Sequence, residues 1–180
     1  MKKITWYKAP FDYKDRVSIG YKSYCGSPPE IYMWEKDCRV DIGKYCSIAN
    51  DCKFITGANH RIDWITTYPF FGCKHGHPAP QGNILLGNDI WLGNSVTVGG
   101  GVTIGDGAVV ATESLVVKDV PPYAIVGGNP AKIIKYRFDE TTISNLLKIQ
   151  WWNWNKKTIK ENRKLLCSDK LDELFGKFLK

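Results

Sequence analysis

The 180-residue chain lacks any apolar run close to the roughly 18 residues that a membrane-spanning helix requires. Its basic first residues are not followed by the apolar core or the small-residue cleavage site of a secretory signal peptide. Neither a Gly-x-Ser-x-Gly hydrolase motif nor a Walker-type phosphate loop occurs. We therefore expect a cytoplasmic protein without a membrane span, and hydrolase and nucleotidase functions have no support.

The chain also lacks any Cys-x-x-Cys pair, although it contains six cysteines. Without a secretory signal we expect these thiols to be reduced, with several filling small interior positions. Cys73, His75 and His77 form a run of possible zinc ligands between glycines. No fourth ligand lies nearby in the sequence, so we expect no metal.

The formal net charge of +7 favours anionic ligands, which include phosphorylated cofactors as well as nucleic acid. Much of the excess lies in residues 156–180, where both signs of charge combine with helical apolar spacing. Because basic and aromatic residues are not interleaved there, we expect a solvated helix face and no nucleic-acid partner. Residues 139–150 and 156–178 are predicted to be helices of a C-terminal cap (139–180). The tryptophans between them are interpreted as packing residues that join the helices to the preceding coil.

A six-residue repeat dominates the middle of the chain. Aliphatic residues, each followed by a small residue, occupy one class of position: Leu86, Leu92, Val98, Ile104 and Val110. Compact or β-branched residues follow each of these four positions later: Ile90, Val96, Val102, Ala108 and Ser114. An earlier block has the same period, in Ile42, Ile48 and Phe54 and in Cys46 and Cys52.

A period of six fits neither an α-helix nor a single amphipathic strand. Short strands joined at corners satisfy it, and three such units make one coil of a triangular prism. Residues 18 apart then lie one above another, so Leu86 should lie beneath Ile104, and Asn94 beneath Thr112. An ordinary β-sandwich with glycine-rich turns is the alternative, although five consecutive hexads in register disfavour it.

Residues 19–138 resemble the hexapeptide-repeat acyltransferases, most clearly in the segment NDIWLGNSVTVGGGVTIGDGAVVATESLVVKDVPPYAIVGGNPAK. The resemblance implies an all-β solenoid, a left-handed parallel β-helix in residues 1–138, with a protruding catalytic loop at 57–83. It also implies acetyl-CoA as co-substrate and a homotrimer with active sites between subunits.

Within the loop, Gly57-Ala58-Asn59-His60-Arg61 resembles the catalytic segment of the xenobiotic branch, which includes chloramphenicol and streptogramin acetyltransferases. In that branch the histidine after asparagine is the general base, which implies this role for His60. An imidazole can take a proton from an acceptor hydroxyl and return it to the leaving thiolate. Asp63 or a backbone carbonyl could orient the ring, and Arg61 is expected to pair with Asp63. The candidate acceptor-binding residues are Asn59, Asp63, Trp64, Tyr68 and Phe70, although the aromatic ones could instead pin the loop to the prism.

The resemblance also implies positions that contact the cofactor: Trp91, Gly93, Asn94, Thr112, Val117, Lys118, Lys132 and Lys135. Lys132 and Lys135 are the candidates for the phosphates, or else generic surface lysines. The loop reads Asp63-Trp64-Ile65-Thr66-Thr67, which departs from the Met-Asp-Gly-Ser pattern of the drug enzymes. We therefore expect O-acetylation of a carbohydrate, such as a cell-surface polysaccharide or a sugar precursor. The alternatives are an antibiotic hydroxyl, the amine of an amino sugar, or a noncatalytic β-helix scaffold.

Overall fold

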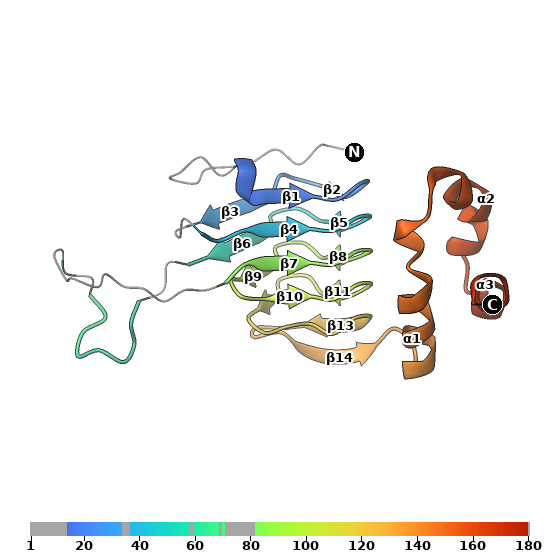
Figure 1. Ribbon diagram of the computed structural model, residues 1–180. Coiled ribbons are helices and arrows are strands. Elements are labelled where there is room, and N and C mark those ends of the chain that lie inside the picture. The colour runs from blue at the N-terminus through green and yellow to red at the C-terminus, as the bar shows by residue number, and fades with distance from the viewer. Residues whose placement is uncertain (1–13, 34–36, 58–59, 69, 71–81, 180) are drawn as a thin grey trace. The chain divides into compact units, whose positions relative to one another are not determined.

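The computed structural model describes residues 14–33, 37–57, 60–68, 70 and 82–179. It divides into two compact units, Met1–Lys135 and Tyr136–Lys180. The first unit is built from strands and the second from helices (Figure 1). Within the described residues, no helix is both long enough and apolar enough to cross a membrane.

The described part of the first unit begins with the short 3-10 helix η1 (Lys14–Arg16) and continues as strands arranged in three sheets. One sheet has the order β1 (Val17–Ile19), β4 (Val40–Ile42), β7 (Ile84–Leu86), β10 (Thr103–Ile104). A second has the order β14 (Lys132–Tyr136), β13 (Ala124–Gly127), β11 (Val109–Val110), β8 (Trp91–Leu92), β5 (Ser47–Ile48), β2 (Tyr24–Cys25). The third has the order β12 (Leu115–Val116), β9 (Thr97–Gly99), β6 (Lys53–Thr56), β3 (Glu30–Met33).

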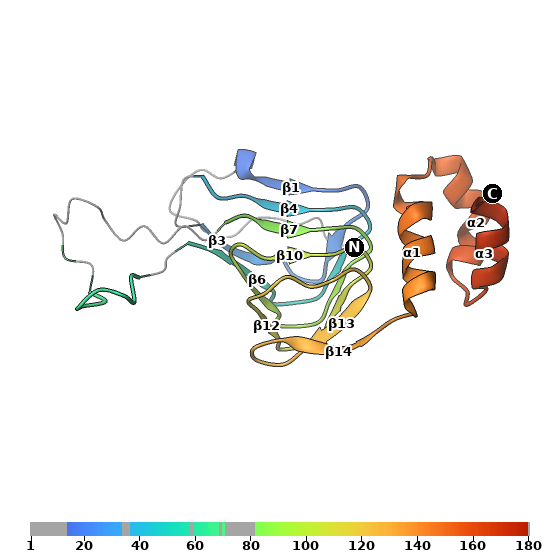
Figure 2. The ribbon, with the colours of Figure 1, turned by 60° about the horizontal axis from the view of Figure 1, so that its bottom comes forward.

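The chain enters the three sheets in rotation, so that β4, β5 and β6 are followed by β7, β8 and β9 one level further along (Figures 1 and 2). The paired strands from β1 to β13 are parallel, and Leu85 pairs with Thr103, which lies 18 positions later. The same separation relates Trp91 to Val109 and Thr97 to Leu115. Leu86 also pairs with Ile104, so the predicted coil of three hexads is confirmed.

The inserted loop interrupts this register between β6 and β7. Asp41 pairs with Leu85, 44 positions later, so one coil contains 26 residues more than the regular 18. The insertion therefore leaves the strands on either side of it stacked as in an uninterrupted coil. A hydrogen bond between the coils before and after the insertion shows that the stack is continuous: the backbone N–H of Gly43 donates to the carbonyl of Leu86 at 2.8 Å.

Both classes of hexad position point into the interior of the prism. The aliphatic class is buried at Ile42, Ile48, Phe54, Leu86, Leu92, Val98, Ile104 and Val110. The compact class is buried at Cys46, Cys52, Ile90, Val96, Val102, Ala108 and Ser114. The core is therefore the one predicted from the period. It forms because strands of two to four residues can bury their apolar side only by stacking coil upon coil.

The second unit contains α1 (Glu140–Ile149), the 3-10 helix η2 (Trp151–Asn153), α2 (Lys156–Leu166) and α3 (Leu171–Phe178). The prediction of a single helix over 156–178 is wrong, because the structure has two helices in this range. Ser168 ends the first of them: its hydroxyl donates to the carbonyl of Leu165 at 2.7 Å and accepts from the backbone N–H of Lys170 at 3.3 Å.

The tryptophans of the second unit pack within it. Trp152 is buried, and Trp154 stacks on Phe178 with ring centroids 4.2 Å apart. The predicted packing role is confirmed inside the helical unit. The predicted connection of this aromatic cluster to the last coil stays a prediction.

Candidate active site

His60 lies in the segment between β6 and β7, and its side chain is exposed. Its Nδ1 is 2.7 Å from the backbone carbonyl oxygen of Thr67. A carbonyl oxygen can only accept, so Nδ1 donates and holds the proton of the neutral ring. The lone pair of the neutral imidazole is then on Nε2, which is the arrangement that a general base requires.

Asp63 and Arg61 form a two-point ion pair beside His60 in the sequence. Arg61 Nε donates to Asp63 Oδ1 at 2.6 Å, and the Arg61 Nη2 donates to the other carboxylate oxygen. The hydrogen bond from Arg61 lowers the pKa of the Asp63 carboxyl below its ordinary value. The expected internal pair is therefore confirmed. Of the two orienting groups that the sequence left open, the backbone carbonyl is the one in contact with the His60 ring.

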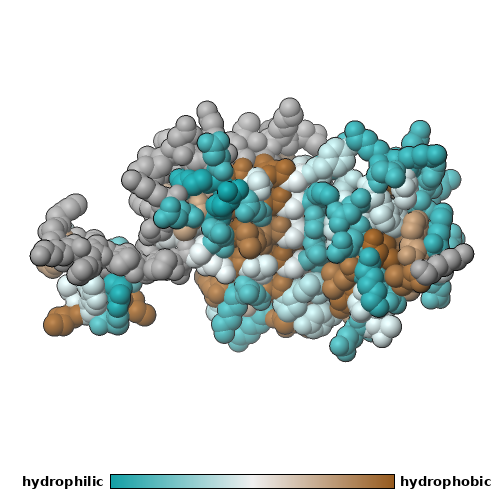
Figure 3. All heavy atoms as spheres, viewed as in Figure 1, coloured by the Kyte–Doolittle hydropathy of each residue, from teal (hydrophilic) through white to brown (hydrophobic). Residues whose placement is uncertain are grey.

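The aromatic residues of the same segment contact one another. Tyr68 and Phe70 meet edge to face, with ring centroids 4.7 Å apart, and the Arg61 guanidinium lies 5.5 Å from the Trp64 ring centroid. Tyr68 and Phe70 nevertheless remain 58% and 62% exposed. The described part of this loop therefore exposes apolar side chains, and Figure 3 shows a few brown spheres among teal ones in this region. Asn59, the remaining acceptor candidate, lies outside the described residues.

Four of the predicted cofactor residues lie together at one corner of the prism. Trp91 is on the outer side of β8 and 57% exposed, and Gly93 and Asn94 turn the corner after it. Thr112 turns the same corner one coil further along, where the backbone N–H of Glu113 donates to the Asn94 carbonyl at 2.8 Å. A Cβ on Gly93 would lie 2.6 Å from the Thr112 backbone nitrogen, so only glycine fits between these coils.

The Asn94 side chain has a structural task that the sequence analysis missed. Its Oδ1 accepts from the backbone N–H of Asn50, on the preceding coil, at 3.1 Å. In the same way, Asn88 Oδ1 accepts from the backbone N–H of Lys44 at 2.9 Å, and Asp106 Oδ1 accepts from the backbone N–H of Asn88 at 2.6 Å. These side chains satisfy backbone donors that the corners leave without a strand partner. The signal was present, because 88, 94 and 106 fit the six-residue period.

Two further cofactor candidates lie at a pocket of about 300 Å³ near the end of the first unit. The pocket is lined by Val116, Lys118, Asp119, Val120, Val126, Ala131, Lys132 and Ile133. Val117 lies between two lining residues in the sequence, is not part of the lining itself and is half exposed. Lys135 is exposed on β14 but is not part of the lining. Four of the eight candidates thus lie at the corner and two, Lys118 and Lys132, at the pocket, beside Asp119, whereas Val117 and Lys135 belong to neither group.

Known proteins with similar sequences are acetyltransferases. A probable macrolide acetyltransferase of Lysinibacillus sphaericus is 50% identical over 153 residues, which cover 79% of this chain and 85% of that protein. A chloramphenicol acetyltransferase of Klebsiella aerogenes is 46% identical, covering 74% and 68% of the two chains. A virginiamycin A acetyltransferase of Staphylococcus aureus is 47% identical, covering 76% and 66%. No family model matches the chain.

Solved structures agree on the fold. A hexapeptide-repeat acetyltransferase of Vibrio cholerae aligns with a TM-score of 0.55 at 27% identity, over 71% of this chain and 66% of that one. The chain belongs to the hexapeptide-repeat acetyltransferases. A galactoside acetyltransferase in complex with coenzyme A aligns with this acetyltransferase at a TM-score of 0.54 and 27% identity, over 77% and 68% of the chains.

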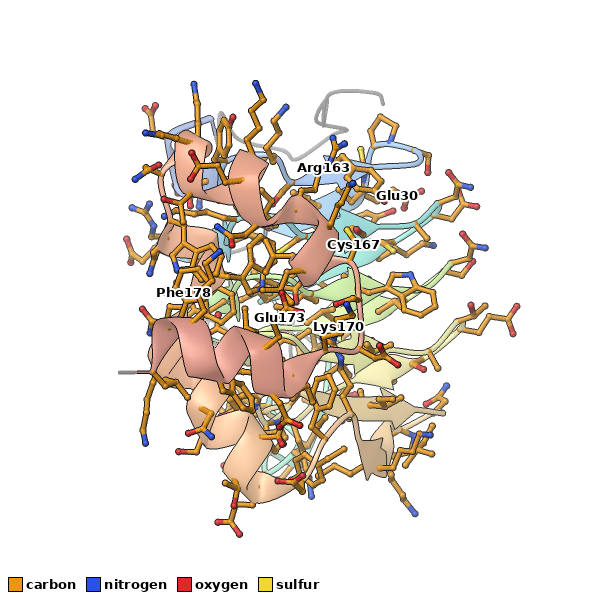
Figure 4. All side chains as sticks on the ribbon, turned by 90° about the vertical axis from the view of Figure 1, so that its right-hand side faces the viewer. Glu30, Arg163, Cys167, Lys170, Glu173 and Phe178 are labelled. Carbon is orange, nitrogen blue, oxygen red and sulfur yellow. The ribbon has the colours of Figure 1, made fainter. Side chains whose placement is uncertain are left out.

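Four of the five described cysteines of this acetyltransferase are packing residues, and the fifth, Cys167, is exposed at the end of α2 (Figure 4). Cys25, Cys38, Cys46 and Cys52 are buried, as expected for several of the six. Burial raises the pKa of Cys46 and of Cys52 to about 11, which keeps both as thiols at neutral pH. Cys73, His75 and His77 lie outside the described residues, and the described residues contain no group of three metal-ligating side chains.

Proposed function

We propose that this enzyme transfers an acetyl group from acetyl-CoA to a hydroxyl of a small acceptor, with His60 as general base. The contact from His60 Nδ1 to the Thr67 carbonyl is the observation that carries the proposal, because it leaves the ring's lone pair on Nε2. Nε2 takes the hydroxyl proton while the acceptor oxygen attacks the thioester carbonyl. The carbon–sulfur bond then breaks, and the proton passes to the CoA thiolate.

Two groups of residues fit acetyl-CoA. At the corner, the exposed Trp91 and Thr112 offer a surface along which an extended pantetheine arm can lie, and the buried Gly93 lets the two coils approach beneath it. The pocket with Lys118 and Lys132 offers two ammonium groups to the phosphates. Both groups support the cofactor assignment, with Asn94, Val117 and Lys135 as further contacts. In this proposal acetyl-CoA supplies the acetyl group and the leaving thiolate.

We further infer that the three sheets wind as a left-handed β-helix in residues 1–138, that residues 139–180 cap it, and that three copies assemble. A trimer would supply the second wall of each cofactor site, since one prism by itself supplies only one wall of a groove. The exposed aromatic residues of the loop also support assembly, because an apolar loop surface is usually covered by a partner or a ligand. The cytoplasmic location stays a prediction.

The favoured acceptor is a hydroxyl-bearing antibiotic. The macrolide, chloramphenicol and virginiamycin acetyltransferases that resemble this chain support it, and so does the apolar loop surface of Tyr68 and Phe70. A carbohydrate hydroxyl is the second candidate, supported by the loop sequence at residues 63–67 and by the likeness to a galactoside acetyltransferase. If the enzyme instead acetylates the amine of an amino sugar, product should form only with acceptors that carry a free amine.

The deciding experiment measures CoA release with acetyl-CoA and a panel: chloramphenicol, virginiamycin, a macrolide, a galactoside and an amino sugar. With the best acceptor, His60→Ala should lower kcat by roughly 10² to 10⁴-fold, the range for removal of a positioned general base. Acetyl-CoA binding, measured by calorimetry, should be nearly unchanged, because the proposed contact of His60 is with the acceptor proton. A folded His60→Ala protein that works at the wild-type rate would show the mechanism to be wrong.

A further inference from the structure

The peptide group between Thr67 and Tyr68 is held at both of its polar ends. Its carbonyl oxygen, which belongs to Thr67, lies 2.7 Å from Nδ1 of His60. Its N–H, which belongs to Tyr68, donates to the hydroxyl oxygen of Thr66 at 3.1 Å. A trans peptide group is planar, with its carbonyl and its N–H on opposite sides, so fixing the direction of one also fixes the other. The Thr66 hydroxyl therefore acts on the same group that contacts the candidate base.

The direction of this peptide group decides which tautomer of the His60 ring is favoured. With the carbonyl toward the ring, Nδ1 must donate, and the lone pair of the neutral ring is on Nε2. If the peptide plane turned over, it would present the Tyr68 N–H to the ring, and Nδ1 would have to accept. The proton would then be on Nε2, which could no longer take a proton from an acceptor hydroxyl. The orientation of one peptide group thus separates a ring that can act as base from one that cannot.

Regular secondary structure does not fix this peptide group. Residues 60–68 form neither a helix nor a strand, so the backbone groups of this segment must bond to side chains, to other loop groups or to water. Thr66 supplies such a bond two residues along the chain, a contact that serine and threonine hydroxyls often make in turns. The carbonyl of Tyr68 in turn accepts from the backbone N–H of Phe70 at 3.0 Å. The local order around the His60 contact therefore starts at the Thr66 side chain.

Neighbouring side chains of the segment are engaged in other contacts. Arg61 and Asp63 bond to each other at two points, and the rings of Tyr68 and Phe70 meet edge to face. Thr66 is exposed, so water competes with its hydroxyl for the Tyr68 N–H. The free energy that the bond contributes is then that of one ordinary hydrogen bond, which corresponds to about three- to ten-fold in the population of the favoured orientation.

We propose that Thr66 is a positioning residue that keeps the His60 ring in the tautomer with its proton on Nδ1. The effect on the rate rests on the proposed function of His60 as general base. Thr66→Val keeps the β-branched shape but removes the hydroxyl that accepts from Tyr68. We expect it to lower kcat by about three- to ten-fold and to leave the KM for acetyl-CoA unchanged. Thr66→Ser keeps the hydroxyl and should retain most of the wild-type kcat.

The tautomer itself is measured by nitrogen NMR of the full chain with ¹⁵N-labelled histidine, at a pH where the rings are neutral. The chain has three histidines, and the signals of His60 are those that disappear in His60→Ala. Wild type should show the proton on Nδ1, and Thr66→Val should show a larger share of the tautomer with the proton on Nε2. Thr103→Val is the matched control, because it removes the hydroxyl of another exposed threonine, on β10. It should leave both the spectrum and kcat unchanged.

A wild-type tautomer distribution in a folded Thr66→Val protein would overturn the proposal. Equal changes in Thr66→Ser and Thr66→Val would also overturn it, because the hydroxyl would then not be the part of the side chain that matters. Failure of the proposed function gives a different result. If the tautomer of Thr66→Val shifts while its kcat stays at the wild-type value, Thr66 positions the ring but His60 is not the base, and His60→Ala should then also retain the wild-type rate.

Discussion

Asp63→Asn distinguishes the two ways in which the His60 ring could be oriented. In the structure the ring nitrogen Nδ1 lies 2.7 Å from the Thr67 carbonyl, and both carboxylate oxygens of Asp63 are bound by Arg61. The substitution keeps an oxygen acceptor toward Arg61 and removes only the charge of an exposed pair. We therefore expect kcat to fall by less than about five-fold, the scale of exposed ion pairs. Where a carboxylate orients a catalytic histidine, the same change costs about 10⁴-fold.

The assay is the initial rate of CoA release at saturating acetyl-CoA and acceptor, with His60→Ala as the matched control for a lost base. The pH profile adds a second measurement. Arg61 lowers the pKa of the Asp63 carboxyl, so the ion pair is complete above the ordinary aspartate pKa and is lost only as pH falls through the lowered value. Wild type and Asp63→Asn should thus have the same profile above about pH 5. A loss of about 10³-fold or more in a folded Asp63→Asn protein would refute orientation by the Thr67 carbonyl.

Three other predictions address the cofactor, the metal and the assembly. Lys132→Ala should raise the apparent KM for acetyl-CoA far more than it lowers kcat, because a remote phosphate contact contributes uniform binding. The effect should shrink with a CoA that lacks its 3′-phosphate, and equal loss with both cofactors would exclude Lys132 from the phosphate site. Chelation should leave the rate unchanged, whereas an EDTA-sensitive rate restored by zinc would make Cys73, His75 and His77 ligands. Sedimentation should find a trimer, and a fully active monomer would contradict a shared active site.

The period of the sequence was enough to predict the core of the first unit. Leu86, Val98 and Ile104 are buried as expected, and strands 18 positions apart lie in register. The reason is that every hexad has the same local geometry, so one rule applied to the sequence places all of them. The second unit follows no such rule. Its predicted 23-residue helix over 156–178 ends instead at Leu166, because the Ser168 side chain competes for backbone groups that the apolar spacing does not reveal.

The candidate site likewise has features that the sequence predicts and features that only the structure reveals. By itself the sequence determined that His60 is the base candidate, that Arg61 pairs with Asp63, and that residues 18 apart share a corner. Each follows from a motif, a neighbour or a fixed period. Only the tertiary structure decided that the Thr67 carbonyl contacts the imidazole, that the Asn94 amide supports the preceding coil, and that Lys118 and Lys132 meet at one pocket. These contacts join residues through the folding of a loop, the stacking of coils and the close of the last strands. The six-residue period marks the corner position of Asn94, but it does not specify which backbone group the side chain contacts, and no spacing predicts the other two contacts.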